Sequence, residues 1–492
     1  MNAADHLNPI FLQALRQALR GRMFQVLFWI TLVLAMSFSL LYIVIATQAG
    51  GEPSGDTYFI WVYAALSFAV HLFVPFSAFL SLGNEWDEDT YELLVLSNLR
   101  PRNIVFGKLL SALLQAGLWF SAFGPFLVFS FLMPGLDLFT FGVILLLTAL
   151  STAFLTNLAL CLSATARGRF ARTFLLALLG LFLSGWALLA VVLASETLEH
   201  PTDLRSSIGQ QAIWGIVTAL VVVGGYLFVF ACTRLAHEEE NRSTGLRVFS
   251  SVILVAAWWW ATSLYLAIGR IAEVFSAFTL MGVLVLTVFS ALYVTEGRGL
   301  GRRVELEVPK SRWLALLSTP WLPGGGRGVA WYWLHLGLWL GAVALTLRVW
   351  PATSVTSPDA TMSRLVVWVG VAYTWIYMAV PAFVFRPWSR RLALRVVARV
   401  AMPVFALLSF LVPTMVLFLF TSGGPEVMEH IGNPVEVVDS FDPTLEGFPH
   451  RLLREPRAWS LGGIGLALVL LHLPGVVHGV REVLAASRAR RA

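Results

Sequence analysis

The residue types that carry out chemistry are sparse in this chain, and their spacing matches no common catalytic motif. The single Gly-Lys pair, Gly107-Lys108, is followed by Leu109, so no Gly-X-X-X-X-Gly-Lys-Ser/Thr phosphate loop exists. His-Glu-X-X-His and Gly-X-Ser-X-Gly are absent, and the two cysteines, Cys161 and Cys232, have no metal-ligand spacing. We therefore expect the chain to be no enzyme and to hold no metal and no cofactor.

One segment, residues 84–108, does combine charge with regular spacing. Four carboxylates recur on one helical face, at i, i+3, i+4 and i+7: Glu85, Glu88, Asp89 and Glu92. Three apolar side chains lie largely off that face: Trp86, Leu93 and Leu94. We expect this helix to end near Arg100, because Pro101 disfavours helical geometry in the residue before it. Such a helix can rest its apolar side on a membrane domain and present its carboxylates to a soluble partner; an acidic interfacial linker is the alternative.

The elements that must position this segment are long apolar runs. Mean hydropathy is +0.77 and only 13% of the residues are charged. About 20 apolar residues cross a hydrocarbon core of roughly 30 Å, so these runs predict an all-α polytopic membrane protein with about twelve transmembrane helices. The predicted spans are 24–46, 58–82, 107–132, 139–163, 173–195, 211–233, 248–269, 274–295, 329–350, 365–385, 400–421 and 459–480.

The distribution of charge predicts the orientation of these spans. Of the 34 Lys and Arg, 27 fall in alternate gaps that include both termini, whereas acidic residues show no such bias. Basic residues are retained on the cytoplasmic side, so we expect an inner-membrane protein with both termini in the cytoplasm. The sequence pI is about 9.6, but the basic residues are dispersed over many loops, which argues against nucleic-acid binding.

Loop lengths indicate two parallel halves of six spans each. In the first half, residues 1–233, the longest loops are 83–106 on one side and 196–210 on the other. The second half, residues 248–492, has its longest loops at the same positions, 296–328 and 422–458, and the polar stretch 234–247 links the halves. Loop 422–458 should lie on the extracytoplasmic side of the membrane and is too small to fold alone.

The residues before the first span predict an amphipathic helix. Polar side chains recur at i, i+3, i+4 and i+7: Gln13, Arg16, Gln17 and Arg20. Pro9 suits the first turn, and Gly21 separates this helix from the first span. We expect an interfacial helix in the plane of the lipid headgroups, with Arg16 and Arg20 on its polar face.

Residues 84–108 resemble the segment between spans two and three of type-2 ABC exporter permeases. The resemblance is carried by these elements: Glu85, Thr90, Glu92-Leu93-Leu94, Ser97, Leu99-Arg100-Pro101 and Gly107-Lys108. The opening residues 8–22 and the stretch Glu240–Arg247 also resemble parts of that family. The resemblance implies a permease, and specifically an exporter, whose coupling helix at Glu85–Pro101 docks a separate ABC ATPase subunit that binds ATP and Mg²⁺.

By this resemblance Glu85, Thr90 and Glu92 would contact the ATPase. Two departures from the family pattern limit the comparison. Asp89 stands where the family often has Gly, and loop 296–328 of the second half lacks the Glu…Thr-X-Glu-Leu-Leu pattern. One chain would then supply one good docking site, and self-association or a second permease subunit could supply another.

Away from the ends of the predicted spans there is no Asp, Glu, Lys or Arg. Carriers driven by protons or sodium generally place such groups at bilayer depth, so their absence weighs against that class. His71, His335 and His472 lie within predicted spans, where we expect helix-packing hydrogen bonds more than a proton relay. A secondary active transporter and a non-transporting membrane scaffold remain the alternatives.

Overall fold

The structure is a computed structural model, and it describes residues 9–48, 54–87, 100–166, 168–236, 240–297, 299–353, 358–384 and 456–491. Within these ranges the regular structure is helical, with no strand. The chain forms two compact units, Met1–His237 and Glu238–Ala492. The division falls inside residues 234–247, the segment interpreted above as a linker. We describe each unit by itself.

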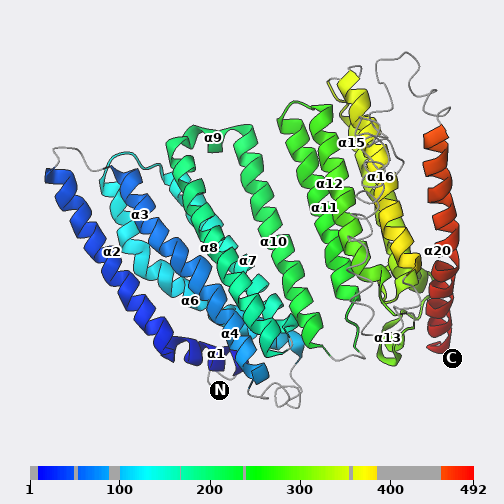
Figure 1. The fold of residues 1–492 in the computed structure, drawn as a ribbon, viewed down its shortest axis with the longest axis horizontal. Coiled ribbons are helices and arrows are strands. Elements are labelled where there is room, and N and C mark those ends of the chain that lie inside the picture. Colours follow the sequence, from blue (N-terminus) through cyan, green and yellow to red (C-terminus); the bar gives the residue numbers. More distant parts are fainter. Residues whose placement is uncertain are drawn as a thin grey trace, which may run out of the picture. The chain divides into compact units, whose positions relative to one another are not determined.

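The first unit consists mainly of long helices that cross it from end to end (Figure 1). Its elements are α1 (Pro9–Arg20), α2 (Arg22–Gln48), α3 (Gly55–Phe68), the π-helical turn η2 (Ala69–Phe73), α4 (Val74–Asp87), α6 (Pro101–Phe129), the 3₁₀ turn η3 (Ser130–Leu132), α7 (Leu138–Thr165), α8 (Arg169–Glu199), α9 (Pro201–Arg205) and α10 (Ser207–Leu235). α3, η2 and α4 run on as one helix with a π-helical turn in its middle.

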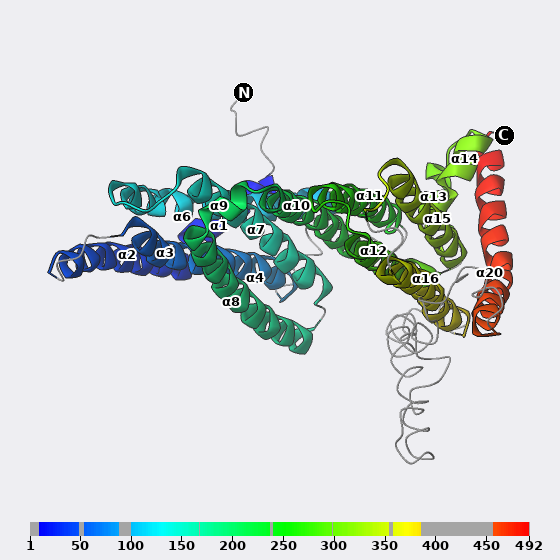
Figure 2. The same ribbon diagram turned by 90° about the horizontal axis from the view of Figure 1, so that it is seen from above.

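The second unit has the same kind of long helices and, in addition, two short ones. Its elements are α11 (Thr244–Ala267), α12 (Ala272–Val294), α13 (Arg302–Glu307), α14 (Arg312–Ser318), the 3₁₀ turn η4 (Thr319–Trp321), α15 (Gly325–Val349), α16 (Pro358–Val384) and α20 (Pro456–Ala489). α13 and α14 lie in loop 296–328, between the end of α12 and the start of α15. Figure 2 shows both short helices beside α20.

Ten helices in the described ranges are long and apolar enough to cross a membrane, and α16 adds a shorter apolar stretch, Val369–Val384. Each of the ten coincides with a predicted span, and the apolar part of α16 coincides with span 365–385. The prediction of an all-helical fold is confirmed for the described residues, and the length and composition of these ten helices are compatible with a multi-pass membrane protein. The predicted span 400–421 and most of loop 422–458 lie outside the described residues, so the total of twelve stays a prediction.

The helix ends follow from local chemistry. The carboxylate of Asp137 accepts a hydrogen bond from the backbone N–H of Thr140 and so caps α7, and the Ser206 hydroxyl caps α10 in the same way. Pro101 is the first residue of α6, and Arg100 before it is extended. This is the geometry that a proline at position 101 predicts.

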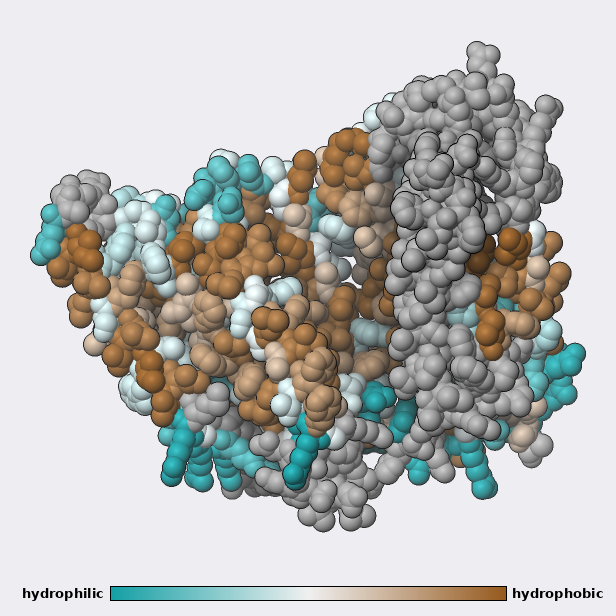
Figure 3. Space-filling model, in the orientation of Figure 1, coloured by the Kyte–Doolittle hydropathy of each residue, from teal (hydrophilic) through white to brown (hydrophobic). Residues whose placement is uncertain are grey.

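Basic residues of the first unit gather at one end of its helices. Apart from Arg205, those in the described ranges lie at the end where α1 lies: Arg16, Arg20, Arg22, Arg100, Arg102, Lys108, Arg169, Arg172 and Arg234. Five acidic residues lie at the opposite end: Asp56, Asp137, Glu196, Glu199 and Asp203. Figure 3 shows apolar side chains along the helices of this unit and hydrophilic ones at their ends. Such segregation is typical of membrane-spanning bundles.

Candidate functional site

The predicted coupling segment is only partly within the described residues. Thr90, Glu92, Leu93 and Leu94 lie outside them, so their predicted contact role is not tested. Glu85 and Trp86 fall in the last turn of α4, and Pro101 opens α6. The two helices that flank the segment pack against each other, so its two ends are held at the same end of the first unit.

A buried lysine ties these two helices together close to the segment. Lys108, two turns into α6, donates hydrogen bonds from Nζ to the Ser81 carbonyl oxygen and to the Ser81 hydroxyl, both at 2.9 Å. One turn earlier in α4, the Ser77 hydroxyl donates to Oε1 of Gln115 on α6 at 2.9 Å. Unpaired ammonium groups are strongly disfavoured in a protein interior, which makes these contacts a constraint on where α4 can lie. We call these contacts, of Lys108 with Ser81 and of Ser77 with Gln115, the α4–α6 joint.

A third helix holds α4 from another side. The Ser163 hydroxyl of α7 donates to the Phe79 carbonyl oxygen of α4 at 2.8 Å. Gly83 allows the side chain of Arg172 to lie close to α4, because a Cβ at this glycine would be 3.3 Å from Cδ of the arginine. The end of α4 that leads into the predicted coupling segment is therefore fixed by α6, α7 and α8.

The predicted amphipathic helix is present as α1, and it packs along α6. Phe11 on its inner side is buried, whereas Arg16 and Arg20 are exposed, as are Gln13 and Gln17. Gly21 separates α1 from α2, as expected. The exposed arginines stand on the face that the spacing predicted.

The three histidines within spans all bond to other helices. His71 lies in the π-helical turn, with Nε2 2.7 Å from the Ser151 hydroxyl of α7 and Nδ1 3.0 Å from the Ser67 hydroxyl. Nε2 of His335 is 2.7 Å from the Ser251 hydroxyl of α11. His472 reaches the Ala379 carbonyl oxygen of α16 at 2.9 Å. These are the packing hydrogen bonds expected from the sequence.

Sequence reasoning missed a buried arginine at the start of α11 in the second unit. Arg247 is fully buried, and its guanidinium donates to the carbonyl oxygens of Pro320, Leu322 and Gly324 at 2.6–3.1 Å. It also pairs with the Glu296 carboxylate at 2.7 Å and lies 5.1 Å from the ring centre of Tyr293. One side chain thus donates to three carbonyl groups of the turn that leads into α15, and the Gly324 carbonyl group also accepts a hydrogen bond from the Gly328 backbone N–H.

A second buried arginine, Arg327, joins α15 to the end of α20. It pairs with Glu482 at 2.7 Å and donates to the Pro323 and Gly479 carbonyl oxygens. Beside it is a cavity of about 190 Å³ whose polar lining includes Glu296, His472 and His478. The Arg327 guanidinium that lines this cavity is paired with the Glu482 carboxylate.

Four charged residues, Arg247, Glu296, Arg327 and Glu482, lie just beyond the ends of predicted spans, and their pairing was not predicted from the sequence. Their partners are distant in the chain, since Arg327 and Glu482 are separated by 155 positions. The signal that could have found them is the sequence Pro-Gly-Gly-Gly-Arg-Gly at 323–328, because glycines there let backbones approach closely. A Cβ on Gly326 would lie 2.2 Å from the Gly475 carbonyl oxygen, and a Cβ on Gly328 would lie 2.6 Å from the Tyr293 carbonyl group.

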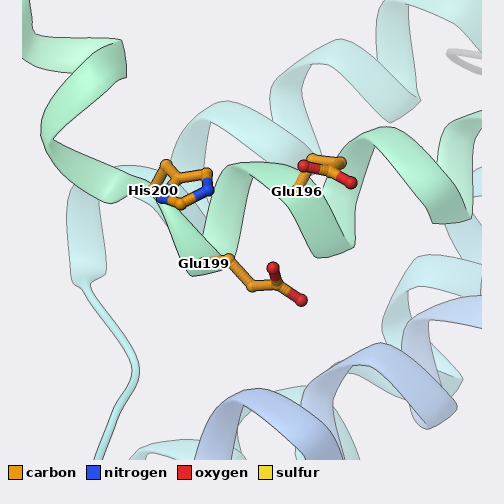
Figure 4. A group of neighbouring side chains, drawn as sticks. All are labelled: Glu196, Glu199 and His200. Carbon is orange, nitrogen blue, oxygen red and sulfur yellow. The ribbon is translucent and has the colours of Figure 1, made fainter.

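A group of metal-ligating side chains lies at the far end of α8 in the first unit. Figure 4 shows Glu196, Glu199 and His200, one ligand atom of each lying within 4.8 Å of the others. All three are exposed, and their i, i+3, i+4 spacing alone brings them together. Exposed groups of this kind are common without a metal, so this group does not define the function.

No protein-family model, no curated protein and no solved structure matches this chain. The likeness to type-2 ABC exporter permeases therefore rests on the residues quoted above.

Proposed function

We propose that this chain is the membrane permease of an ATP-driven exporter, and that Glu85–Pro101 docks a separate ABC ATPase subunit. The observation that carries the proposal is the α4–α6 joint, because Lys108 ties the helix that leads into the segment to the helix that leads out of it. A docking segment can pass on force only if its two ends are fixed to the helices it must move. The ATP and Mg²⁺ would be bound by the partner.

The charge and position of the neighbouring residues support this assignment. Glu85 follows directly on the part of α4 that is fixed to α6 and α7. α1 packs on α6 and exposes Arg16 and Arg20, which suits a helix at the cytoplasmic headgroup layer. The protein would lie in a bacterial or archaeal inner membrane with both termini in the cytoplasm. Self-association or a second permease subunit would complete the transporter.

Co-purification from the native membrane tests the proposal. The unmodified chain should bring down an ATPase subunit, and charge reversal in Glu85→Lys with Glu92→Lys should release it. Glu199→Lys is the matched control, since Glu199 is an exposed carboxylate at the opposite end of the first unit. If the double variant retains the ATPase as well as the control does, the docking assignment is wrong.

A proton-coupled carrier is the second candidate, favoured by His71. An ionisable side chain inside a span is a functional-site hypothesis by default, and single π-helical turns occur frequently at functional sites. An uncoupler that abolishes transport while ATP is maintained would favour this carrier over the exporter. Co-purification of a larger complex with no transport at all would instead indicate a scaffold.

A further inference from the structure

The short helix α14 exposes all four of its large apolar side chains. Trp313 is 79% exposed and Leu317 is 67% exposed, and Leu314 and Leu316 are also exposed. Ala315 is the residue that faces inward, and it is fully buried. A seven-residue helix that presents Trp and Leu outward forms the kind of apolar patch that marks an interaction surface.

This face is fixed in place by its inner side. Ala315 packs in a small core with Val304, Val308, Leu322 and Val483. The Ser487 hydroxyl of α20 donates to the Lys310 carbonyl oxygen at 3.0 Å. We call residues 302–318, which comprise α13 and α14, the elbow. Because the elbow is tied to α20, the exposed face has a defined direction.

The elbow lies level with the ends of the candidate spans around it. α12 ends at Val294, and α15 begins at Gly325, directly after the turn that follows η4. α14 packs on α20, whose exposed apolar surface includes Leu473 and Val477. α14 thus lies against a helix that also exposes apolar side chains. Tryptophan is enriched at this depth, where its ring lies among the headgroups.

Basic side chains flank the apolar face. Four of them in the elbow are exposed: Arg302, Arg303, Lys310 and Arg312. The elbow also has two exposed carboxylates, Glu305 and Glu307, and Glu307 accepts a hydrogen bond from Asn241. Arg303 pairs with Glu240 at 3.5 Å, which leaves Arg302, Lys310 and Arg312 as the other exposed cations. Arg481 and Arg488 of α20 are exposed at the same end of the unit. An apolar face bordered by cations is complementary to an anionic bilayer surface.

We propose that the elbow lies flat in the headgroup layer, with Trp313 and Leu317 inserted into the bilayer and Lys310 and Arg312 bound to anionic phospholipid. This partner differs from the ATPase proposed for the first half. The two segments also differ in charge. Residues 85–92 are acidic, whereas residues 302–318 are apolar with flanking basic residues. The inference does not depend on the exporter assignment.

A fluorophore at position 317 tests the proposal in the full-length chain. Cys161 and Cys232 are changed to Ala, Leu317→Cys is labelled with a nitrobenzoxadiazole probe, and the protein is placed in phosphatidylcholine vesicles with added phosphatidylglycerol. The probe should emit at shorter wavelength, be quenched by lipid spin-labelled near the headgroup, and be quenched several-fold less by aqueous iodide than a probe at Glu305→Cys. Trp313→Cys repeats the test at a second exposed position.

The lipid dependence tests the basic residues. Removing phosphatidylglycerol, or introducing Lys310→Gln with Arg312→Gln, should increase iodide quenching at position 317. If the probe at 317 is quenched by iodide as strongly as the probe at 305, the proposal is wrong. If 317 becomes shielded only when an ATPase subunit is added, the elbow docks protein, and the proposal is also wrong.

Discussion

At the scale of single residues, the buried arginines of the second unit are the most informative finding. Arg247 supplies hydrogen bonds to three carbonyl groups of a turn and to one carboxylate. A guanidinium suits this role because its donors are fixed in a plane and it remains charged. The turn in question leads directly into α15, so Arg247 determines how that helix begins.

Arg247→Met should destabilise the protein strongly. Removing one partner of a buried ion pair typically reduces the free energy of unfolding by about 3–5 kcal/mol, because here the Glu296 carboxylate loses its counter-ion and three carbonyl groups lose a charged donor. Thermal unfolding in detergent, followed by tryptophan fluorescence, measures the change. Arg348→Met, at an exposed arginine near the other end of α15, is the control and should have little effect.

Asp137 predicts a pH dependence. The backbone N–H of Thr140, above all, lowers the pKa of this carboxyl group, and the nearby Arg205 lowers it further. A carboxyl group whose pKa is lowered on folding stabilises the folded state above its ordinary pKa, and this contribution is lost as the pH falls through the lowered pKa. Asp137→Ala should therefore lower the melting temperature near neutral pH.

The same measurement at acidic pH is the control for Asp137→Ala. At a pH low enough to protonate Asp137 in both the folded and the unfolded state, the difference in melting temperature between the two proteins should shrink. A difference that is equally large at pH 7 and at strongly acidic pH would contradict the assignment of this carboxylate as a charged cap.

At the scale of elements, glycines set how closely the helices of the second unit approach. A Cβ on Gly328 would lie 2.6 Å from the Tyr293 backbone carbon and oxygen, so α15 can contact the end of α12 only with glycine at this position. Gly337, farther along α15, has open space around a Cβ. The two positions form a matched pair on one helix.

Gly328→Ala should destabilise the second unit, and Gly337→Ala should not. Overpacking of a tight contact typically lowers the free energy of unfolding by about 1–3 kcal/mol, whereas alanine in an open helical position is favourable by up to about 1 kcal/mol. Chemical or thermal unfolding of the two single variants in the same detergent gives the comparison. Equal stability of the two variants would show that α15 can shift away without loss.

A mutation in the α4–α6 joint should impair transport without impairing the docking of the ATPase. Lys108→Met keeps the length of the side chain but removes the hydrogen bonds to Ser81. If the proposed ATPase docks at Glu85–Pro101, its association should persist, because the proposed docking residues are unchanged, while stimulation of ATP hydrolysis by the membrane subunit should fall several-fold. Leu109→Met, one position along, is the control; if both variants behave as the unmodified protein does, the joint transmits nothing.

Elements were predicted better than contacts. Hydropathy located each long helix, and Pro101, Gly21 and the spacing of Arg16 and Arg20 located helix ends and an exposed face, because these signals are local in the chain. The Arg247–Glu296 and Arg327–Glu482 pairs could not be predicted, since they join positions 49 and 155 residues apart. Lys108 was read only as part of a motif, although its buried contact with Ser81 depends on how α4 and α6 pack.

At the scale of the whole molecule, charge asymmetry predicts the orientation in the membrane. Cysteines placed in Ser440→Cys and Ser311→Cys variants test it in intact cells. Position 440 should react with a membrane-impermeant maleimide from outside, and position 311 only after permeabilisation, because basic loops are retained in the cytoplasm. Labelling of both positions from the same side would require an even number of spans between them, and would contradict the three that are predicted.

The contacts of α20 also determine when the second unit can finish folding during synthesis. Residues 302–322 leave the ribosome well before Val483 and Ser487, which are needed to hold them. Until translation ends, the carbonyl group of Lys310 and the side chain of Arg327 lack partners that lie 177 and 155 positions downstream. A chain that stops short of those last turns would leave these polar groups exposed at the membrane, where a quality-control protease can recognise them.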